Sequence, residues 1–128
     1  MTLDEGFRQF WTERRLASLT TVRPNGTPHV VAVGVTVDFE QGIARVIASG
    51  TSYKARLVRA AGDTGLAGAV CQFEGRTWST LEGRIRLLDD AASVRDAEER
   101  YARRYRQPRE NPQRVVLELT IGRVLGNA

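Results

Sequence analysis

The chain has 128 residues, of which 41% are hydrophobic and 27% charged, with a formal net charge of +4 at pH 7, values typical of one soluble globular domain over residues 1–128. No apolar run approaches the roughly 18 residues of a membrane span, and residues 1–11 lack the apolar core of a signal peptide. The single Cys71 excludes an internal disulfide, so a cytoplasmic protein is expected.

The first part of the chain is expected to form a helix and a hairpin. Apolar residues recur at spacings of three and four near the start: Leu3, Phe7, Phe10 and Trp11. This spacing predicts a helix over residues 1–14, with Thr2 as N-cap and Glu5 as its capping-box partner. Residues 16–22 alternate as a strand, and the turn sequence RPNG at 23–26 predicts that the next strand pairs back on it.

Residues 27–37 (TPHVVAVGVTV) are the longest β-branched stretch. Both alternating faces are small or apolar, which predicts one central strand buried on both sides. Gly34 in its middle permits a bend or a close backbone approach. Residues 38–42 then turn the chain into a further strand over 43–49.

After a short helix that begins near Lys54, three further elements are expected. They are a strand over residues 64–73, a strand over 76–88 with a bulge or barrel corner at Gly83, and a peripheral helix over 90–105 capped by Asp89 or Asp90. Residues 115–121 alternate as a final strand. Some six strands joined by tight turns predict an antiparallel sheet that curls into a barrel. The alternation of strands and long helices that builds a doubly wound sheet is missing.

The turn at residues 50–54 (GTSYK) is the candidate functional centre, and it contains the only lysine of the chain. A lysine and two hydroxyl groups lie beside the free N–H groups of a predicted helix start. The helix dipole and these N–H groups favour a bound anion, so the turn is a candidate phosphate seat. The plainer interpretation of a lysine at a helix start is a solvated side chain.

Other candidate residues have a structural interpretation when taken alone. His29, the only imidazole, is more typical of a packed strand residue than of a ligand contact. Trp78, midway along a strand, is more typical of a core or an interface. The mixed charges of residues 95–114 favour a solvated amphipathic helix and its exit loop, with a surface for an acidic ligand tail as the alternative.

Several common sites are excluded. One histidine and one cysteine cannot form a zinc cluster, and no G-x-S-x-G motif is present for a serine hydrolase. Lys54 is followed by Ala55 rather than Ser or Thr, which excludes a Walker P-loop. Paired carboxylates suited to acid–base catalysis are not visible in the sequence.

In combination, four stretches carry a resemblance: PHVVAVGV, ARVIASGTSYKA, RTWSTLEGR and RDAEERYARRYRQPRENPQRVVLEL. In this order they resemble the pyridoxamine-phosphate-oxidase-like split β-barrel superfamily. Within it the chain is similar to the small actinobacterial oxidoreductases that depend on the deazaflavin coenzyme F-420, and most of all to the biliverdin reductase type. The resemblance covers residues 16–126, and its specific parts are the S-x-K-A turn and the W-x-x-x-E-G-R strand.

The resemblance implies a mainly β fold, a six-stranded antiparallel split barrel of the FMN-binding type with peripheral helices. It also implies a homodimer with the cofactor groove at the subunit interface. The implied cofactor-binding residues are His29, Val30, Val31, Ala32 and Val33 along the ring, Gly50, Thr51, Ser52, Lys54 and Ala55 at the phosphate, and Trp78 in the groove wall.

The implied reaction is hydride transfer from reduced F-420 to a conjugated substrate, with biliverdin to bilirubin as the closest match. The cofactor supplies the reactivity, so no catalytic side chain and no metal are assigned. Two alternatives stay open. One is an FMN-binding flavoprotein on the same barrel, and the other is a non-catalytic module that binds polyanions. A nucleic acid partner is not expected, because aromatic residues interleaved with basic strands are not evident, and a membrane partner is not expected, because no apolar run is long enough for a span.

Overall fold

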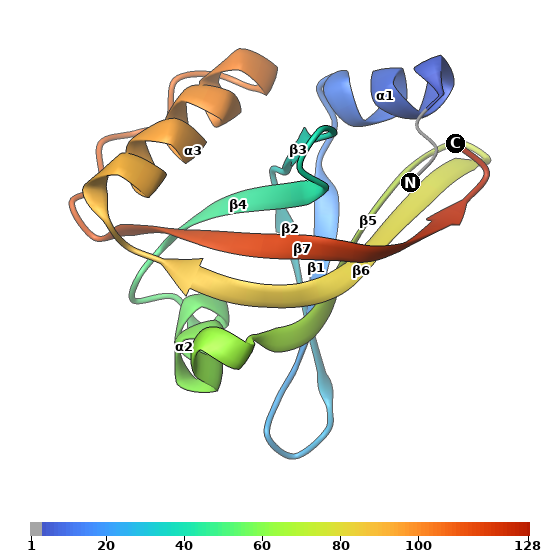
Figure 1. The fold of residues 1–128 in the computed structure, drawn as a ribbon. Coiled ribbons are helices and arrows are strands. Elements are labelled where there is room, and N and C mark those ends of the chain that lie inside the picture. The colour runs from blue at the N-terminus through green and yellow to red at the C-terminus, as the bar shows by residue number, and fades with distance from the viewer. Residues whose placement is uncertain (1–3) are drawn as a thin grey trace.

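The computed structural model describes residues 4–128, and within them it contains three α-helices, a short 3-10 helix and seven strands (Figure 1). In chain order these are α1 (Glu5–Thr12), β1 (Ala17–Val22), β2 (Pro28–Val33), β3 (Thr36–Asp38), β4 (Ile43–Ser49), α2 (Tyr53–Ala61), η1 (Gly62–Thr64), β5 (Leu66–Glu74), β6 (Thr77–Leu88), α3 (Ala91–Arg104) and β7 (Arg114–Gly126). The strands form one antiparallel sheet in the order β2-β1-β5-β6-β7-β4-β3. The mainly β fold is confirmed, with seven strands in place of six.

The additional strand arises because residues 27–37 form two strands on opposite edges of the sheet. β2 pairs with β1 at one edge, and β3 pairs with β4 at the other. The chain crosses between them at Gly34, where an added Cβ would lie 2.8 Å from Tyr101 Cε2. The expected bend and close approach at Gly34 are therefore confirmed.

The prediction of one central strand buried on both faces is wrong. β2 is an edge strand, and Val30 on its outer face is 57% exposed. The reason is that β-branched residues suit a pleated strand wherever it lies, whereas burial depends on what covers each face. The local sequence does not show which other segments of the chain pack on each face of the strand.

Helix α1 is shorter than the predicted helix over residues 1–14. It begins at Glu5 and is capped by Asp4, whose Oδ1 accepts a hydrogen bond from the Phe7 N–H (2.8 Å). The predicted cap, Thr2, lies outside the described residues, and Asp4 occupies the N-cap position instead. Trp11 donates from Nε1 to the buried Ser79 hydroxyl (3.0 Å), which ties the helix to β6.

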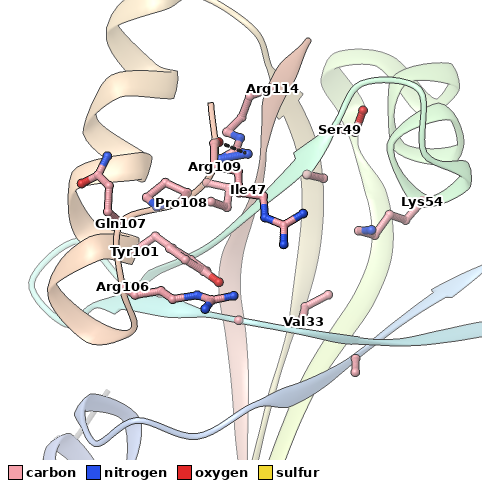
Figure 2. Close-up of a pocket in the computed structure, with 13 residues that line it drawn as sticks. Val33, Ile47, Ser49, Lys54, Tyr101, Arg106, Gln107, Pro108, Arg109 and Arg114 are labelled. Atoms are coloured by element: carbon pink, nitrogen blue, oxygen red, sulfur yellow. Dashed lines mark hydrogen bonds between the residues drawn. The ribbon is translucent and has the colours of Figure 1, made fainter. Parts of the chain in front are cut away.

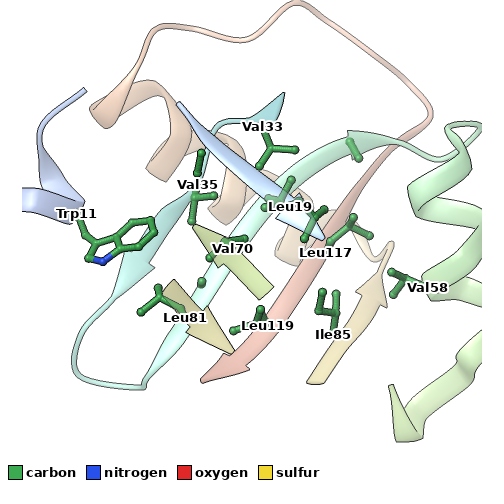
Figure 3. Packing of buried hydrophobic residues seen from close by; sticks show 14 of the residues in the cluster. Trp11, Leu19, Val33, Val35, Val58, Val70, Leu81, Ile85, Leu117 and Leu119 are labelled. Carbon is green, nitrogen blue, oxygen red and sulfur yellow. The ribbon is translucent and has the colours of Figure 1, made fainter. Parts of the chain in front are cut away.

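The hydrophobic core fills the interior of the curved sheet. It is built by inward-facing residues of the strands, among them Leu19, Val70, Leu81, Ile85, Leu117 and Leu119, together with Val35 of the crossing between β2 and β3. Figure 3 shows Trp11 of α1 and Val58 of α2 on opposite sides of this cluster. Within residues 4–128, no helix is long and apolar enough to cross a membrane.

The predicted bulge at Gly83 is confirmed. The β6–β7 register shifts between Glu82 and Gly83, and a Cβ on Gly83 would lie 1.8 Å from the Thr120 carbonyl oxygen. Only glycine fits so close to a neighbouring backbone. The predicted cap of the peripheral helix is also found, because the Asp90 carboxylate accepts a hydrogen bond from the Ser93 N–H (3.0 Å).

Candidate functional site

A pocket of about 540 Å³ lies between β2, β4, the start of α2 and the loop after α3 (Figure 2). Its volume is in the range of sites that bind cofactors and small molecules. The lining residues are Ala32, Val33, Gly34, Ile47, Ala48, Ser49, Lys54, Tyr101, Arg106, Gln107, Pro108, Arg109 and Arg114. Three of them, Ala32, Val33 and Lys54, are cofactor-binding residues implied by the sequence.

The turn before α2 is ordered by its own hydroxyl groups. Ser52 is the N-cap, and its Oγ accepts a hydrogen bond from the Ala55 N–H (3.3 Å) and donates one to the Ser49 carbonyl (2.8 Å). The Thr51 and Ser49 hydroxyls are 3.0 Å apart. These side chains therefore shape the turn, and Ala55 is fully buried beneath the helix start.

The same turn is fixed against the beginning of β7. The Gly50 N–H donates to the Gln113 carbonyl (2.7 Å), and a Cβ on Gly50 would lie 2.9 Å from that oxygen. Because the turn is held on both sides, the first turn of α2 presents Lys54 to the pocket in a fixed direction. The positive end of the helix dipole adds to the charge of this lysine.

Four cationic side chains from three parts of the chain line the pocket. Lys54 comes from α2, Arg106 and Arg109 from the loop after α3, and Arg114 from the start of β7. Figure 2 shows Lys54, Arg106 and Arg109 directed toward a common space. This donor set is suited to phosphate or carboxylate groups.

The loop that carries Arg106 and Arg109 is positioned by the end of α3. Arg104 donates from Nη2 to the Glu13 carbonyl (2.8 Å) and from Nη1 to the Val35 carbonyl. The Tyr105 hydroxyl donates to the Arg15 carbonyl (2.6 Å) and accepts from the Val35 N–H (3.0 Å). Burial lowers the pKa of Arg104 and raises the pKa of Tyr105. Both groups therefore anchor the helix end to the crossing between the edge strands.

These arginines were missed as individual site residues. Sequence reasoning interpreted residues 95–114 mainly as a solvated face, with an acidic-tail surface as the alternative. The structure divides the segment, because Arg95, Glu99 and Arg103 are exposed on α3, whereas the loop after α3 lines the pocket. The signal in the sequence was the run RQPR at residues 106–109, where two arginines flank a proline just beyond a helix end.

The other implied ring contacts have different environments. His29 is half-buried, with its ring 5.0 Å from that of Tyr53 in an edge-on arrangement. Its Nδ1 is buried and has no hydrogen-bond partner among the described residues. Val31 packs against the core, whereas Val30 faces outward.

Trp78 is outside the pocket lining. It lies near the start of β6, opposite Phe73 of β5, and the two side chains are 40% and 73% exposed. Within one subunit the structure thus brings together Ala32, Val33 and Lys54 but not Trp78. The implied contact of Trp78 with the cofactor stays a prediction.

Comparisons with known proteins agree with this architecture. Residues 3–128 match the sequence model of the family described as pyridoxamine 5'-phosphate oxidase. The chain is 54% identical over 119 residues to a biliverdin reductase from Mycobacterium tuberculosis (strain CDC 1551 / Oshkosh) that depends on reduced F-420, and the match covers 93% of this chain and 84% of the relative.

Among solved structures, an F-420 reductase superposes with a TM-score of 0.71 at 21% identity, covering 96% of this chain and 98% of that one. A conserved hypothetical protein from Mycobacterium tuberculosis superposes with a TM-score of 0.78 at 18% identity, covering 98% of this chain and 85% of that one. At these identities the superpositions establish the fold.

Proposed function

The chain belongs to the pyridoxamine 5'-phosphate oxidase family, and on that premise we propose that it is an oxidoreductase that uses coenzyme F-420 to reduce a conjugated substrate. We propose biliverdin, reduced to bilirubin, as that substrate, which is supported by the 54% identity to a biliverdin reductase. The observation that carries the proposal is the pocket in which Lys54, at the start of α2, faces the apolar residues Ala32 and Val33 of an edge strand.

The residues of the pocket fit such a cofactor. A deazaflavin cofactor has a flat ring, a phosphate and an acidic tail, and the lining offers an apolar wall together with four cations. We assign the phosphate to Lys54 and the turn before α2, and the ring to the side of β2. Arg106 and Arg109 would then hold the acidic tail. Each charge-assisted hydrogen bond of this kind contributes about 1.5–3 kcal/mol.

When bound, the reduced deazaflavin supplies the hydride. The contribution of the chain is to orient the substrate against the ring and to balance the negative charge of the cofactor. Aspartate, glutamate and histidine are missing from the pocket lining within residues 4–128. We therefore propose that water, rather than a carboxylic acid or an imidazole, supplies the proton that completes the reduction.

We further propose that the protein is a homodimer that meets through the outer face of the sheet. Exposed apolar side chains gather on that face, which we call the outer apolar face: Leu16, Val22, Val30, Phe73, Trp78 and Leu125. Apolar surfaces of this kind are typical of protein interfaces. In a dimer of this type Trp78 would contact the cofactor bound to the partner subunit.

The test is to titrate the purified protein with F-420 and, separately, with FMN, following cofactor fluorescence. We expect F-420 to bind, Lys54→Ala to weaken it at least about tenfold, and Arg95→Ala, an exposed residue of α3 outside the pocket, to leave it unchanged. Equal affinities for wild type and Lys54→Ala would refute the assignment of the phosphate site.

Two other results would replace the proposed function. Binding of FMN without F-420 would make the protein a flavoprotein. Binding of a polyanion with a steep salt dependence, and of neither cofactor, would make it a non-catalytic module. With F-420 bound, the substrate is tested by following oxidation of the reduced cofactor on addition of biliverdin.

A further inference from the structure

Arg114 carries hydrogen-bond donors that the fold does not use. Its side chain is only 10% exposed, and its Nε and Nη1 are buried without a hydrogen-bond partner among residues 4–128. Nη2 donates to the Arg109 carbonyl (2.9 Å). Glu98 is its ion-pair partner, with Oε2 3.5 Å from Nη1, but the pair forms no hydrogen bond.

Burial of a guanidinium whose N–H groups lack hydrogen-bond acceptors lowers the stability of the fold. Each buried donor without an acceptor destabilises the fold by about 1–3 kcal/mol, and a charge removed from water adds to that cost. The cost is offset when a carboxylate or phosphate accepts from the planar guanidinium. Arg114 lines the same pocket as Lys54, so a ligand bound there lies against this residue.

The position of Arg114 is fixed relative to the candidate phosphate seat. It is paired with Ser49 across the β4–β7 ladder, and the preceding residue, Gln113, accepts the hydrogen bond of Gly50. Arg114 and Lys54 therefore lie on neighbouring segments that are hydrogen-bonded to each other, rather than on a mobile surface. Figure 2 shows Arg114, the first residue of β7, next to Arg109 of the loop after α3.

We propose that Arg114 is a further anion-binding residue of this pocket, whose guanidinium binds a carboxylate or phosphate of the ligand. The proposal rests on the proposed function for the identity of that ligand. The anionic group has two sources there, the cofactor and the propionate carboxylates of a linear tetrapyrrole. Glu98 acts as a competing internal anion, so its removal should strengthen ligand binding.

The experiment compares wild type with Arg114→Gln, Arg114→Lys and Glu98→Gln, with Arg95→Gln as the matched control outside the pocket. Dissociation constants for F-420 come from fluorescence titration, and KM is measured for biliverdin and for its dimethyl ester. Loss of a charge-assisted hydrogen bond corresponds to at least about tenfold weaker binding. Arg114→Lys, which keeps the charge and loses the planar fork, should fall between wild type and Arg114→Gln.

A tenfold loss of F-420 affinity in Arg114→Gln identifies the cofactor as the source of the anion. Unchanged F-420 affinity with a raised KM for biliverdin, but not for its ester, identifies the substrate. In either case Glu98→Gln should change the same quantity in the opposite direction. If a folded Arg114→Gln changes neither quantity, or if Glu98→Gln weakens binding, the proposal is wrong.

The outcome can be separated from failure of the proposed function. If wild type binds no F-420, thermal stabilisation by inorganic phosphate is measured instead, because phosphate probes the pocket without a cofactor. Stabilisation that is present in wild type and Arg95→Gln but lost in Arg114→Gln supports the role of Arg114. Equal stabilisation in all variants overturns it. If Arg114→Gln does not fold, Arg114→Lys and Glu98→Gln give the same comparison.

Discussion

The crossing at Gly34 offers the sharpest test of how the fold shapes the pocket. A Cβ added there would lie 2.8 Å from Tyr101 Cε2 and 3.0 Å from Tyr105 Cε2, whereas carbon atoms pack at about 3.5–4.0 Å. Tyr105 is held by hydrogen bonds to Arg15 and Val35, so it cannot retreat easily. Gly34→Ala must therefore displace the ring of Tyr101, which lines the pocket.

The size of the effect follows from two opposing contributions. Overpacking of this kind costs about 1–3 kcal/mol. Gly34 is not among the glycines with positive φ, so alanine fits its backbone and restores about 0.4–1 kcal/mol by restricting the unfolded chain. We expect a net loss of up to about 2.6 kcal/mol in the free energy of unfolding, centred at about 1.3 kcal/mol, or about 4 °C in Tm per kcal/mol.

The assay is urea unfolding of a double-mutant cycle with Tyr101→Ala. Without the Tyr101 ring the closest contact of the added methyl group is removed and only the contacts with Tyr105 remain, so the cost of Gly34→Ala should shrink by more than about 0.5 kcal/mol, beyond ordinary additivity. An equal cost in both backgrounds would refute the reasoning, because the loss would then not come from the ring of Tyr101.

Three further outcomes are expected. Gly83→Ala should lower the free energy of unfolding by more than about 3 kcal/mol or prevent folding, because its Cβ would meet a backbone oxygen at 1.8 Å. The nearby Gly122→Ala, whose Cβ would have its nearest atom at 3.8 Å, should change the free energy of unfolding by less than about 0.5 kcal/mol, as measured by urea unfolding. Burial raises the pKa of Tyr105, so the unfolded chain loses the proton of this hydroxyl first as the pH rises past the ordinary value of 10.0. The free energy of unfolding of the wild type should therefore fall above that pH. Tyr105→Phe should show a flatter dependence of stability on pH in unfolding experiments at pH 8–11. Trp78→Ser should weaken self-association about tenfold in sedimentation analysis without lowering monomer stability, and an unchanged equilibrium would exclude the outer apolar face as the interface.

Local pattern predicted most of the elements because strands and turns are specified by neighbours in sequence. The hairpin at residues 23–26, the bulge at Gly83 and the cap at Asp90 each depend on a few adjacent residues, and all three are found. The strand over residues 27–37 was wrong because its division depends on rings supplied by Tyr101 and Tyr105, some 70 positions away.

The residues of the candidate site show the same difference between features set by adjacent residues and features set by distant ones. Lys54 could be proposed from the sequence because a candidate phosphate seat, a turn followed by a helix start, depends on consecutive residues, and Lys54 does line the pocket. Arg106 and Arg109 were not proposed, since their direction is set by Arg104 and Tyr105, which bond to residues 13–35 across most of the chain. Arg114 carries no local signal either, because its burial depends on α3.

Finally, the short crossing at Gly34 limits how the barrel can deform. The two edge strands are consecutive in the chain, so from Val33 to Thr36 the edges can separate by no more than about 11 Å. No such tether joins the far ends of β2 and β3. The tether therefore limits how far the two edges can separate next to Gly34. Because Ala32, Val33 and Gly34 line the pocket, the wall of the pocket at the crossing is subject to this limit.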